Sequence, residues 1–522
     1  MSLTQFSVDD GPHSMDGLRL SARDGSEPVE AFVGRGLPSL IVTGLPGATV
    51  QDARERIRPA VEHAGLEWPL RRVVVNLAPG NLRKEGAGLD LPIAVSVLAA
   101  TAQVPSNRLT GVVLAGELSL RGEVLSTPGI LSMVIAAVRA QYRTVVVPEA
   151  NAVEAAQVGG IDVVPVGTLE RAVAYLRGAW EPPVDQPAAI EQGWQAPDVD
   201  LADVRGQLQA RRALEVAAAG GHNLLLVGSP GAGKTMLARR LASILPALTR
   251  DEALEASQLH SVAGLLAGRG LLRARPFRSP HHTISTAGLL GGGSTVLRPG
   301  EASLAHRGVL FLDELTEFRR DAIEALRQPI EDGAVVVARA GGSVTFPARF
   351  TLVAAANPCP CGFRGDLVRT CPCRDDQLAR YAAKLSGPLL DRIDLRLSVP
   401  RLTKHELLGA SEGEPSAAVR ARVVAARDRQ LGRYDAIGLT CNAHLPGPMV
   451  RREAALTGAA ERFLGAAVES AALSGRGFDR VLRVARTIAD LAGSNRVDVD
   501  HVAEALSYRE ALQDADPVSS AG

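Results

Sequence analysis

The sequence predicts an α/β protein that is built from more than one domain. In residues 1–178, apolar strand-like runs alternate with amphipathic helix patterns, and in residues 201–400 the strands become continuous apolar runs. Continuous runs suit a buried parallel sheet that is covered by helices on both faces. After residue 400 the apolar residues recur with the 3.6-residue period of helices. A chain of 522 residues is also too long for one hydrophobic core.

The domains are expected to divide where the pattern changes. In the first α/β domain, residues 1–178, the expected strands are SLIVTGL, RRVVVNLAP, GVVLAGELSL and RTVVVPEA. Residues 179–200 carry four prolines without any periodicity, which predicts a linker. A second α/β domain is expected over 201–400, followed by helices over 401–512 and a tail over 513–522.

Composition limits the possible partners and the compartment. Lys+Arg and Asp+Glu both number 57, so any surface that binds nucleic acid must be local. No apolar run is long enough to cross a membrane and the N-terminus does not resemble a signal peptide, so we expect a cytoplasmic protein without a membrane partner. In that compartment, clustered cysteines more often bind metal or carry redox chemistry than form structural disulfides.

A phosphate-binding loop is predicted near the start of the second domain. The segment GSPGAGKT matches the pattern GxxxxGK[ST] and stands between the strand NLLLV and the helix TMLARRLASIL. Backbone N–H groups of such a loop bind phosphate oxygens at a helix N-terminus. Lys234 is expected to reach the β- and γ-phosphates of ATP, and the Thr235 hydroxyl to bind Mg²⁺. The predicted nucleotide-binding residues are Gly228, Ser229, Pro230, Gly231, Ala232, Gly233, Lys234 and Thr235.

Two further strands of this domain end in polar side chains. The strand GVLFLDE brings Asp313 and Glu314 to the carboxyl edge of the sheet, where ligands of open α/β sheets bind. Asp313 is expected to hold Mg²⁺ through its water shell, and Glu314 to activate the attacking water as a general base. The strand FTLVAAAN ends in Asn357, whose uncharged amide would orient that water. The alternative for Asn357 is a simple Asn-Pro turn.

Four of the five cysteines follow directly behind this asparagine. Cys359, Cys361, Cys371 and Cys373 form two Cys-x-Cys pairs that are separated by nine residues. Four thiolates suit tetrahedral Zn²⁺, although the usual knuckle is Cys-x₂-Cys. The alternatives are reduced cysteines in a surface loop or a transient disulfide. Cys441 stands apart and is expected to have no ligand role.

Several segments together resemble the YifB/ComM family of magnesium-chelatase-like AAA+ ATPases. They include DVRGQLQARRALEVAAAGGHNLLLVGSPGAGKTMLARRL, RPFRSPHHTISTAGLLGGG, VAAANPCPCG and GFDRVLRVARTIADLAG, and the resemblance runs from about residue 30 to 510. It implies an AAA+ core with a C-terminal helical lid, assembled as a ring that is expected to be a hexamer. At Ser229 the family more often has a second proline, a departure that should leave the phosphate contacts intact.

The resemblance also assigns two arginines to the ATP site. Arg392 in LLDRIDL matches the arginine finger that enters the neighbouring subunit's site, and Arg476 in SGRGFDR matches the second sensor arginine of the lid. A finger stabilises charge on the transferring phosphoryl group, so hydrolysis would require the ring. Other candidates for these roles are Arg380, Arg396 and Arg483.

The first domain resembles the Lon-type protease fold, but it lacks the catalytic pair of that fold. Gly88 stands where the family has its nucleophilic serine, and the partner lysine would fall near Leu131 in GILSM. Without a nucleophile or a base, no protease activity is expected. The domain is interpreted as a scaffold.

Two basic segments are candidates for the pore of the ring. One is a predicted β-hairpin, VVVARAGGSVTFPARF, with Arg339 near its tip, for which the alternative is an ordinary edge hairpin. The other lies in the long interval before Asp313 and is followed by the pair His281-His282, which could instead bind a metal ion. The arginines of this second segment are Arg269, Arg273, Arg275 and Arg278.

The favoured function is a ring motor that moves along single-stranded or branched DNA, as in the branch migration of recombination or DNA uptake. A protein-remodelling AAA+ ATPase is the main alternative, because ring motors share one ATP site whatever they thread. A magnesium-chelatase subunit is a third possibility. No acidic linker or integrin-like metal domain follows the ATPase region to support it.

Overall fold

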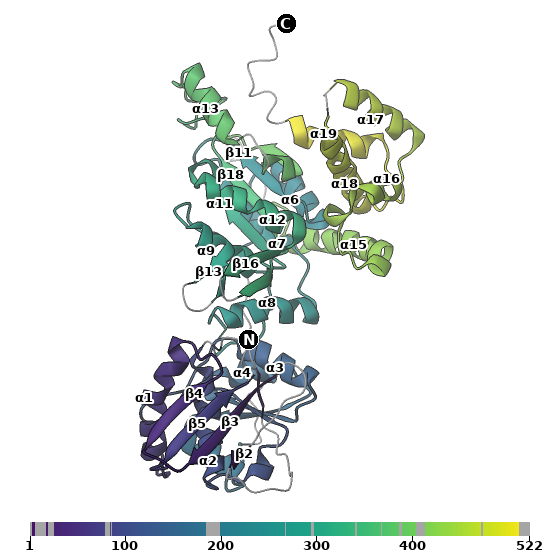
Figure 1. Ribbon diagram of the computed structural model, residues 1–522. Coiled ribbons are helices and arrows are strands. Elements are labelled where there is room, and N and C mark those ends of the chain that lie inside the picture. Colours follow the sequence, from purple (N-terminus) through teal and green to yellow (C-terminus); the bar gives the residue numbers. More distant parts are fainter. Residues whose placement is uncertain are drawn as a thin grey trace.

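The protein is described by a computed structural model. Figure 1 shows helix α8 lying between the two sheets, with one sheet on each side of it. Most of the predicted linker and the whole predicted tail, residues 184–198 and 513–522, lie outside the described residues. The structure describes residues 3–5, 17–18, 26–78, 84, 86–183, 199–266, 268–293, 297–339, 342–366, 368–385, 389–402, 413–470 and 473–510.

The first sheet is mixed. Its strand order is β10-β9-β6-β1-β3-β5-β4, with β2 paired to β3, and β1 runs antiparallel to β6. Alternate residues of β5 are buried, as expected for a strand with one face on a core. The strands are β1 (Leu3–Gln5), β2 (Gly17–Leu18), β3 (Ser26–Gly34), β4 (Ser39–Thr43), β5 (Arg72–Leu77), β6 (Val112–Leu114), β9 (Thr144–Pro148) and β10 (Asp162–Val166).

The segment GVVLAGELSL does not form one strand as expected. It divides into β6 and β7 (Glu117–Leu118), and β7 pairs with β8 (Val124–Leu125) in a separate hairpin. Gly116 lies between β6 and β7, and a Cβ atom there would lie 2.5 Å from Val124 Cγ1, so β8 packs closely at this position. The helices around this sheet are α1 (Ala48–His63), α2 (Asp90–Ala100), α3 (Ile130–Arg139), α4 (Ala152–Ala156) and α5 (Leu169–Leu176).

The second sheet is parallel throughout and has the strand order β12-β15-β18-β11-β19. Every residue of β11, β15 and β18 is buried, which confirms the sheet inferred from continuous apolar runs. Its strands are β11 (Leu224–Val227), β12 (Phe277–Arg278), β15 (Val309–Leu312), β18 (Thr351–Ala356) and β19 (Leu395–Ser398).

Alternate residues of these strands belong to two different cores. Leu224 and Leu226 pack with α6 (Leu208–Gly220), α7 (Lys234–Ile244) and the C-terminal helices. Leu225 and Val227 pack with the shorter helices on the opposite face. Those elements are α9 (Thr286–Leu290), α10 (Glu301–Leu304), α11 (Arg320–Ala325) and α12 (Arg327–Asp332).

A two-stranded hairpin precedes β18, as the sequence predicts. β16 (Ala334–Arg339) pairs antiparallel with β17 (Gly342–Pro347), and Arg339 is opposite Gly342 at the end of the ladder. The Arg339 side chain lies outside the described part of the structure. A smaller ribbon of β13 (Gly291–Gly292) and β14 (Arg298–Pro299) lies nearby in the chain.

The described residues after β19 are helical, apart from short turns, and form the predicted helical lid. Its central helix α18 buries one face against α6 and the neighbouring lid helices (Figure 1). None of the described helices combines the length and apolar character that crossing a bilayer requires. The lid helices are α15 (Ser416–Tyr434), α16 (Gly447–Ala454), α17 (Gly458–Ser470), α18 (Gly475–Leu491) and α19 (Val499–Glu510), whereas α13 (Asp375–Leu385) precedes β19.

Helix α8 (Arg250–Val262) joins the two α/β parts of the chain. The Ser261 carbonyl accepts a hydrogen bond from Gly129 N at 2.9 Å, and the Ser261 hydroxyl accepts one from Leu131 N at 3.3 Å. Gly268 N donates to the carbonyl of Ala150 at 3.0 Å. The first domain is therefore fixed to the element that follows the phosphate loop helix.

Candidate ATP site and cysteine centre

The segment GSPGAGKT adopts the strand–loop–helix arrangement that its motif requires. It follows β11, and Lys234 begins α7. Gly231 and Gly233 have φ values of +79° and +91°, in the left-handed region that favours glycine. A Cβ atom on Gly228 would lie 2.2 Å from the carbonyl oxygen of Val399, so only glycine fits there. The backbone N–H groups at the start of α7 are thus available for an anion.

Lys234 lies at the centre of this loop. Its Nζ donates to the carbonyl oxygens of Gly228 at 2.6 Å and Ser229 at 3.1 Å, and to Asn357 Oδ1 at 3.2 Å. Burial lowers the pKa of Lys234, although the Asp313 and Glu314 carboxylates oppose this shift. The structure therefore brings Asn357 to the phosphate loop, because β18 is paired with β11.

The predicted Mg²⁺ ligands also meet. The Thr235 hydroxyl donates to Asp313 Oδ2 at 2.6 Å. A hydroxyl beside a carboxylate provides the hard oxygen donors that Mg²⁺ prefers, so these residues fit the ion. Glu314 follows with φ +54°, an uncommon left-handed conformation for a residue with a side chain. Its N–H donates to Asp313 Oδ1 at 3.0 Å, which links the two acidic residues.

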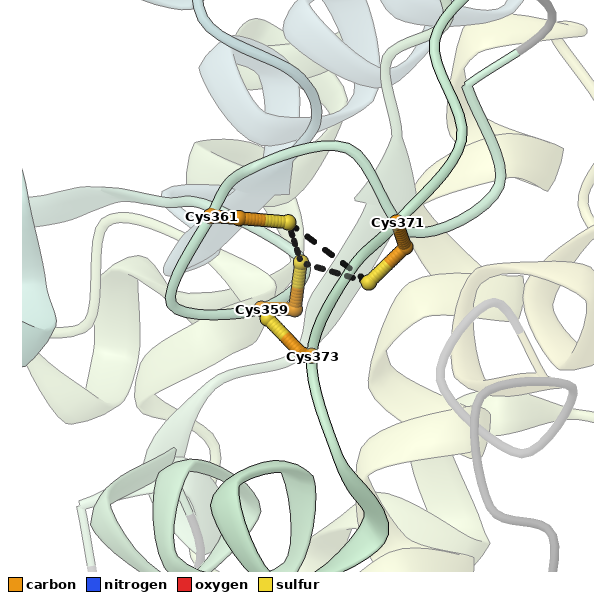
Figure 2. A group of neighbouring side chains, drawn as sticks. All are labelled: Cys359, Cys361, Cys371 and Cys373. Atoms are coloured by element: carbon orange, nitrogen blue, oxygen red, sulfur yellow. Dashed lines mark hydrogen bonds between the residues drawn. The ribbon is translucent and has the colours of Figure 1, made fainter.

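The four clustered cysteines converge (Figure 2). The Sγ atom of Cys359 lies 3.3 Å from that of Cys361 and 3.7 Å from that of Cys371, and all four Sγ atoms lie within 4.8 Å of one another. Zn–S bonds of about 2.3 Å at tetrahedral angles place sulfur atoms about 3.8 Å apart, so the donor set fits one zinc ion. All are free thiols, as is Cys441, which does not belong to the group.

The cysteine-bearing loop packs directly on the phosphate loop. A Cβ atom on Gly362 would lie 2.7 Å from Pro230 Cδ. Arg401 Nη2 donates to the Pro230 carbonyl at 3.0 Å, and Arg401 Nε lies 3.2 Å from Asp366 Oδ2. The Val368 N–H, followed by the Ser229 hydroxyl, lowers the pKa of Asp366 by hydrogen bonding to its carboxylate. The sequence analysis did not predict these contacts, and no motif in the sequence indicates them.

Arg392 is buried in this chain. It ends the short turn Leu390–Arg392 before β19, and its side chain, 7% exposed, forms an ion pair with Glu331. Arg476 is exposed in the first turn of α18. Among the rival arginines, Arg380 pairs with Asp376 on its own helix.

Two other rival arginines contact main-chain oxygens. Arg396 donates to the carbonyl of Leu390 at 3.0 Å, and Arg483 donates to that of Leu445 at 2.9 Å. Both guanidinium groups therefore have partners within their own chain.

The predicted basic cluster divides into two pairs. Arg269 and Arg273 are exposed. Arg275 donates to the carbonyl of Pro246 and pairs with Glu252 at 2.8 Å. Arg278 forms a bidentate pair with Glu301, at 2.6 and 2.7 Å. The last two arginines are thus held by partners inside the chain and do not belong to an open basic surface.

The fold and site define a P-loop ATPase of the AAA+ class. A parallel sheet carries the phosphate loop after β11, the acidic pair after β15 and the asparagine after β18, and a helical lid follows. ATP and Mg²⁺ are the cofactors of this class. Family models cover most of the chain: "Subunit ChlI of Mg-chelatase" matches residues 29–151, "Magnesium chelatase, subunit ChlI" residues 200–407, and its C-terminal model residues 413–509.

The chain belongs to the YifB/ComM family. YifB of Escherichia coli is 43% identical over 484 residues, which cover 92% of this chain and 93% of YifB. The competence protein ComM of Haemophilus influenzae is 41% identical over 488 residues, or 92% and 94% of the two chains. A Lon protease of Rhizobium meliloti is 27% identical over 195 residues, 34% of this chain and 23% of Lon. The chain thus combines a Lon-protease-like domain, an AAA+ core and a helical lid.

Proposed function

We propose that this protein is a ring-forming AAA+ ATPase that uses ATP hydrolysis to move along and remodel DNA. The observation that carries the ATPase assignment is the convergence of Lys234, Thr235, Asp313 and Asn357 in one site. The DNA assignment is supported by the similarity to a protein named for competence, and by the β16–β17 hairpin with Arg339 at the end of its ladder.

In the proposed mechanism the backbone N–H groups of residues 231–235 bind the phosphates, and Lys234 exchanges its carbonyl partners for β- and γ-phosphate oxygens. Thr235 and Asp313 would hold Mg²⁺, and the ion would supply positive charge beside the phosphates. Glu314 accepts a proton from the attacking water, and Asn357 orients that water. Asn357 suits this role because its amide adds no negative charge near the phosphate.

The ring is proposed to complete the site in trans. Arg392 would leave Glu331 and enter the neighbouring subunit's site, and Arg476 would approach from the lid. An arginine supplied in this way is worth about 10³ or more in rate. Isolated subunits would therefore hydrolyse ATP slowly, and assembly, which we propose to be hexameric, would be a condition of turnover.

Zinc is proposed to occupy the cysteine centre at one ion per chain. The four thiolates would hold the loop against Pro230 and behind Asn357. Structural zinc of this kind stabilises the fold of a segment that has little apolar core of its own.

DNA is proposed to bind through phosphate contacts. Arg275 and Arg278 are paired within the chain. Arg339, at the end of the hairpin ladder, is the first candidate, followed by Arg269 and Arg273, whose side chains are exposed. A ring repeats each arginine in every subunit, so a few positions make a dense basic annulus. Affinity should then fall steeply with salt and depend little on sequence.

The alternative is a protein-remodelling ATPase with the Lon-like domain as its adaptor. It is supported by large apolar side chains that this domain exposes, among them Leu37 at 87% and Leu70 at 72% exposure. Such side chains are ordinary when scattered but can mark a docking surface when they gather.

The deciding experiment measures binding of fluorescent single-stranded and branched DNA at low and moderate salt, with a non-hydrolysable ATP analogue. The ATPase rate with and without DNA is measured in parallel. Salt-sensitive binding by wild type that is weakened in Arg339→Ala supports the DNA motor. Absence of binding by assembled rings at low salt favours protein remodelling.

A further inference from the structure

Among the side chains of helix α13 that the structure describes, only that of Tyr381 is buried, at 8% exposure. Figure 1 shows this helix projecting beyond the second sheet. A buried tyrosine usually keeps a hydrogen-bond partner for its hydroxyl group. The partners of Tyr381 lie at the ends of two strands that carry residues of the ATP site, and the mechanism described so far gives this side chain no role.

The hydroxyl group of Tyr381 bridges the segments that follow β18 and β15. It donates to the backbone carbonyl of Asn357 at 3.0 Å. The hydroxyl of Thr316, two residues after Glu314, lies 3.1 Å from the same tyrosine oxygen. A carbonyl has no proton to give, so Tyr381 is the donor to Asn357, and Thr316 then donates to Tyr381. The other acceptor near the Thr316 hydroxyl, Glu317 Oε1, is farther away at 3.4 Å.

This bridge lies where the backbone pairing of the two strands has ended. The ladder between β15 and β18 stops at the pair Leu312 and Ala354. Glu314 and Asn357 both come after that point, so the ladder does not fix the distance between them. Asn357 is instead held at two places, because Lys234 Nζ donates to its side-chain oxygen at 3.2 Å while Tyr381 holds its main-chain carbonyl.

We propose that Tyr381 is a positioning residue that sets the separation between Glu314 and Asn357 by joining the segments that carry them. The phenol takes no part in the chemistry, and it acts through the two residues that it aligns. The inference rests on the proposed function, because it takes Glu314 and Asn357 to act together on the attacking water.

The test compares Tyr381→Phe, Thr316→Val and the double variant, which remove one or both hydroxyl groups and keep the shapes of the side chains. A misplacement of about 1 Å can slow an enzyme about a hundredfold, so partial loss of alignment should lower kcat about tenfold in each single variant. The Kd of a non-hydrolysable ATP analogue should change less than twofold, because the two hydroxyl groups contact Asn357 and each other. The double variant should be no slower than either single variant, since both changes break one bridge.

Tyr434→Phe is the matched control. Tyr434 of α15 is also buried, and its hydroxyl group donates to Asn442 Oδ1 at 2.8 Å within the lid. Loss of this hydroxyl should lower the unfolding temperature as Tyr381→Phe does, but kcat should stay within twofold of the wild-type value. If Tyr381 were only a structural residue, the two variants would have the same kcat.

Three results would overturn the inference: a kcat of Tyr381→Phe within twofold of wild type, an equal loss in Tyr434→Phe, or single losses that multiply in the double variant. Light scattering checks that each variant assembles as the wild type does. If Tyr381→Phe fails to fold or to assemble, Thr316→Val decides, because it removes the other end of the bridge.

Glu314→Gln and Asn357→Ala separate this inference from the proposed function. Wild-type turnover in either variant rejects the role proposed for that residue. Slow turnover in both, beside a wild-type-like Tyr381→Phe, rejects only the role of Tyr381.

Discussion

Gly362 allows a direct test of whether the cysteine loop supports the phosphate loop. An alanine there would place Cβ 2.7 Å from Pro230 Cδ and 2.8 Å from Cγ. Ordinary carbon contacts begin at about 3.5 Å, so the two loops would have to separate by about 0.8 Å. Because Pro230 belongs to the turn that presents N–H groups to the phosphates, we expect Gly362→Ala to weaken nucleotide binding about tenfold, or about 1.4 kcal/mol.

Gly365 provides the matched control. Both glycines have positive φ, +83° and +73°, so an alanine at either position adds about 1–2 kcal/mol of backbone strain. Only at Gly362 does the new methyl group meet a neighbour, since nothing lies within 4 Å of a Cβ on Gly365. Titration with a fluorescent non-hydrolysable ATP analogue gives the two dissociation constants, and elemental analysis checks that both variants keep their metal. Equal dissociation constants with equal metal content would refute the reasoning.

Four further predictions concern the ATP site, the metal, the first domain and pH. Lys234→Ala should lose nucleotide binding, while Glu314→Gln and Arg392→Ala should bind ATP with little turnover. Wild-type turnover by Arg392→Ala would reject the assignment of Arg392 as the arginine finger. Zinc should copurify at about one ion per chain and be lost in Cys371→Ser, as elemental analysis of reduced protein can show. The purified protein should show no ATP-dependent cleavage of peptides, because its first domain lacks the nucleophile and the base of the Lon-type fold. Burial lowers the pKa of His306 to about 4, so the unfolded chain binds the proton first, and stability should fall by up to about 3 kcal/mol between pH 6.5 and 4. Thermal unfolding of His306→Gln should show a shallower pH dependence.

The second sheet was predicted correctly because it depends on local patterns, and the residues proposed for the ATP site come together at its carboxyl edge. The strand before GSPGAGKT, the glycine-rich turn and the helix after it are contiguous in the chain, so the motif and the elements that it requires can be recognised together. Asp313 and Asn357 could be placed because each ends a strand, and parallel strands end at one edge of a sheet. The cysteine centre was predicted for a similar reason, since all four ligands lie within a short segment.

What the sequence could not predict depends on partners that are distant along the chain. Nothing in the run of arginines before Asp313 reveals that Glu252 and Glu301 neutralise Arg275 and Arg278. The charge count is the same whether an arginine is exposed or paired. Likewise, β1 and β3 were not predicted. The segment containing β6 and β7 was predicted as one strand, although β7 pairs with β8, a later segment of the chain.

On the proposed mechanism, two contacts of this structure act on different requirements of the ATP site. The cysteine loop positions the phosphate-binding turn through Pro230, which affects nucleotide binding. Glu331 retains Arg392 within its own chain, which keeps this arginine from stabilising charge in the neighbouring subunit. Since turnover requires bound nucleotide and the neighbour's arginine at once, releasing Arg392 alone leaves turnover limited by nucleotide binding. A motor built in this way would hydrolyse ATP quickly only when the nucleotide and the adjacent subunit are present together.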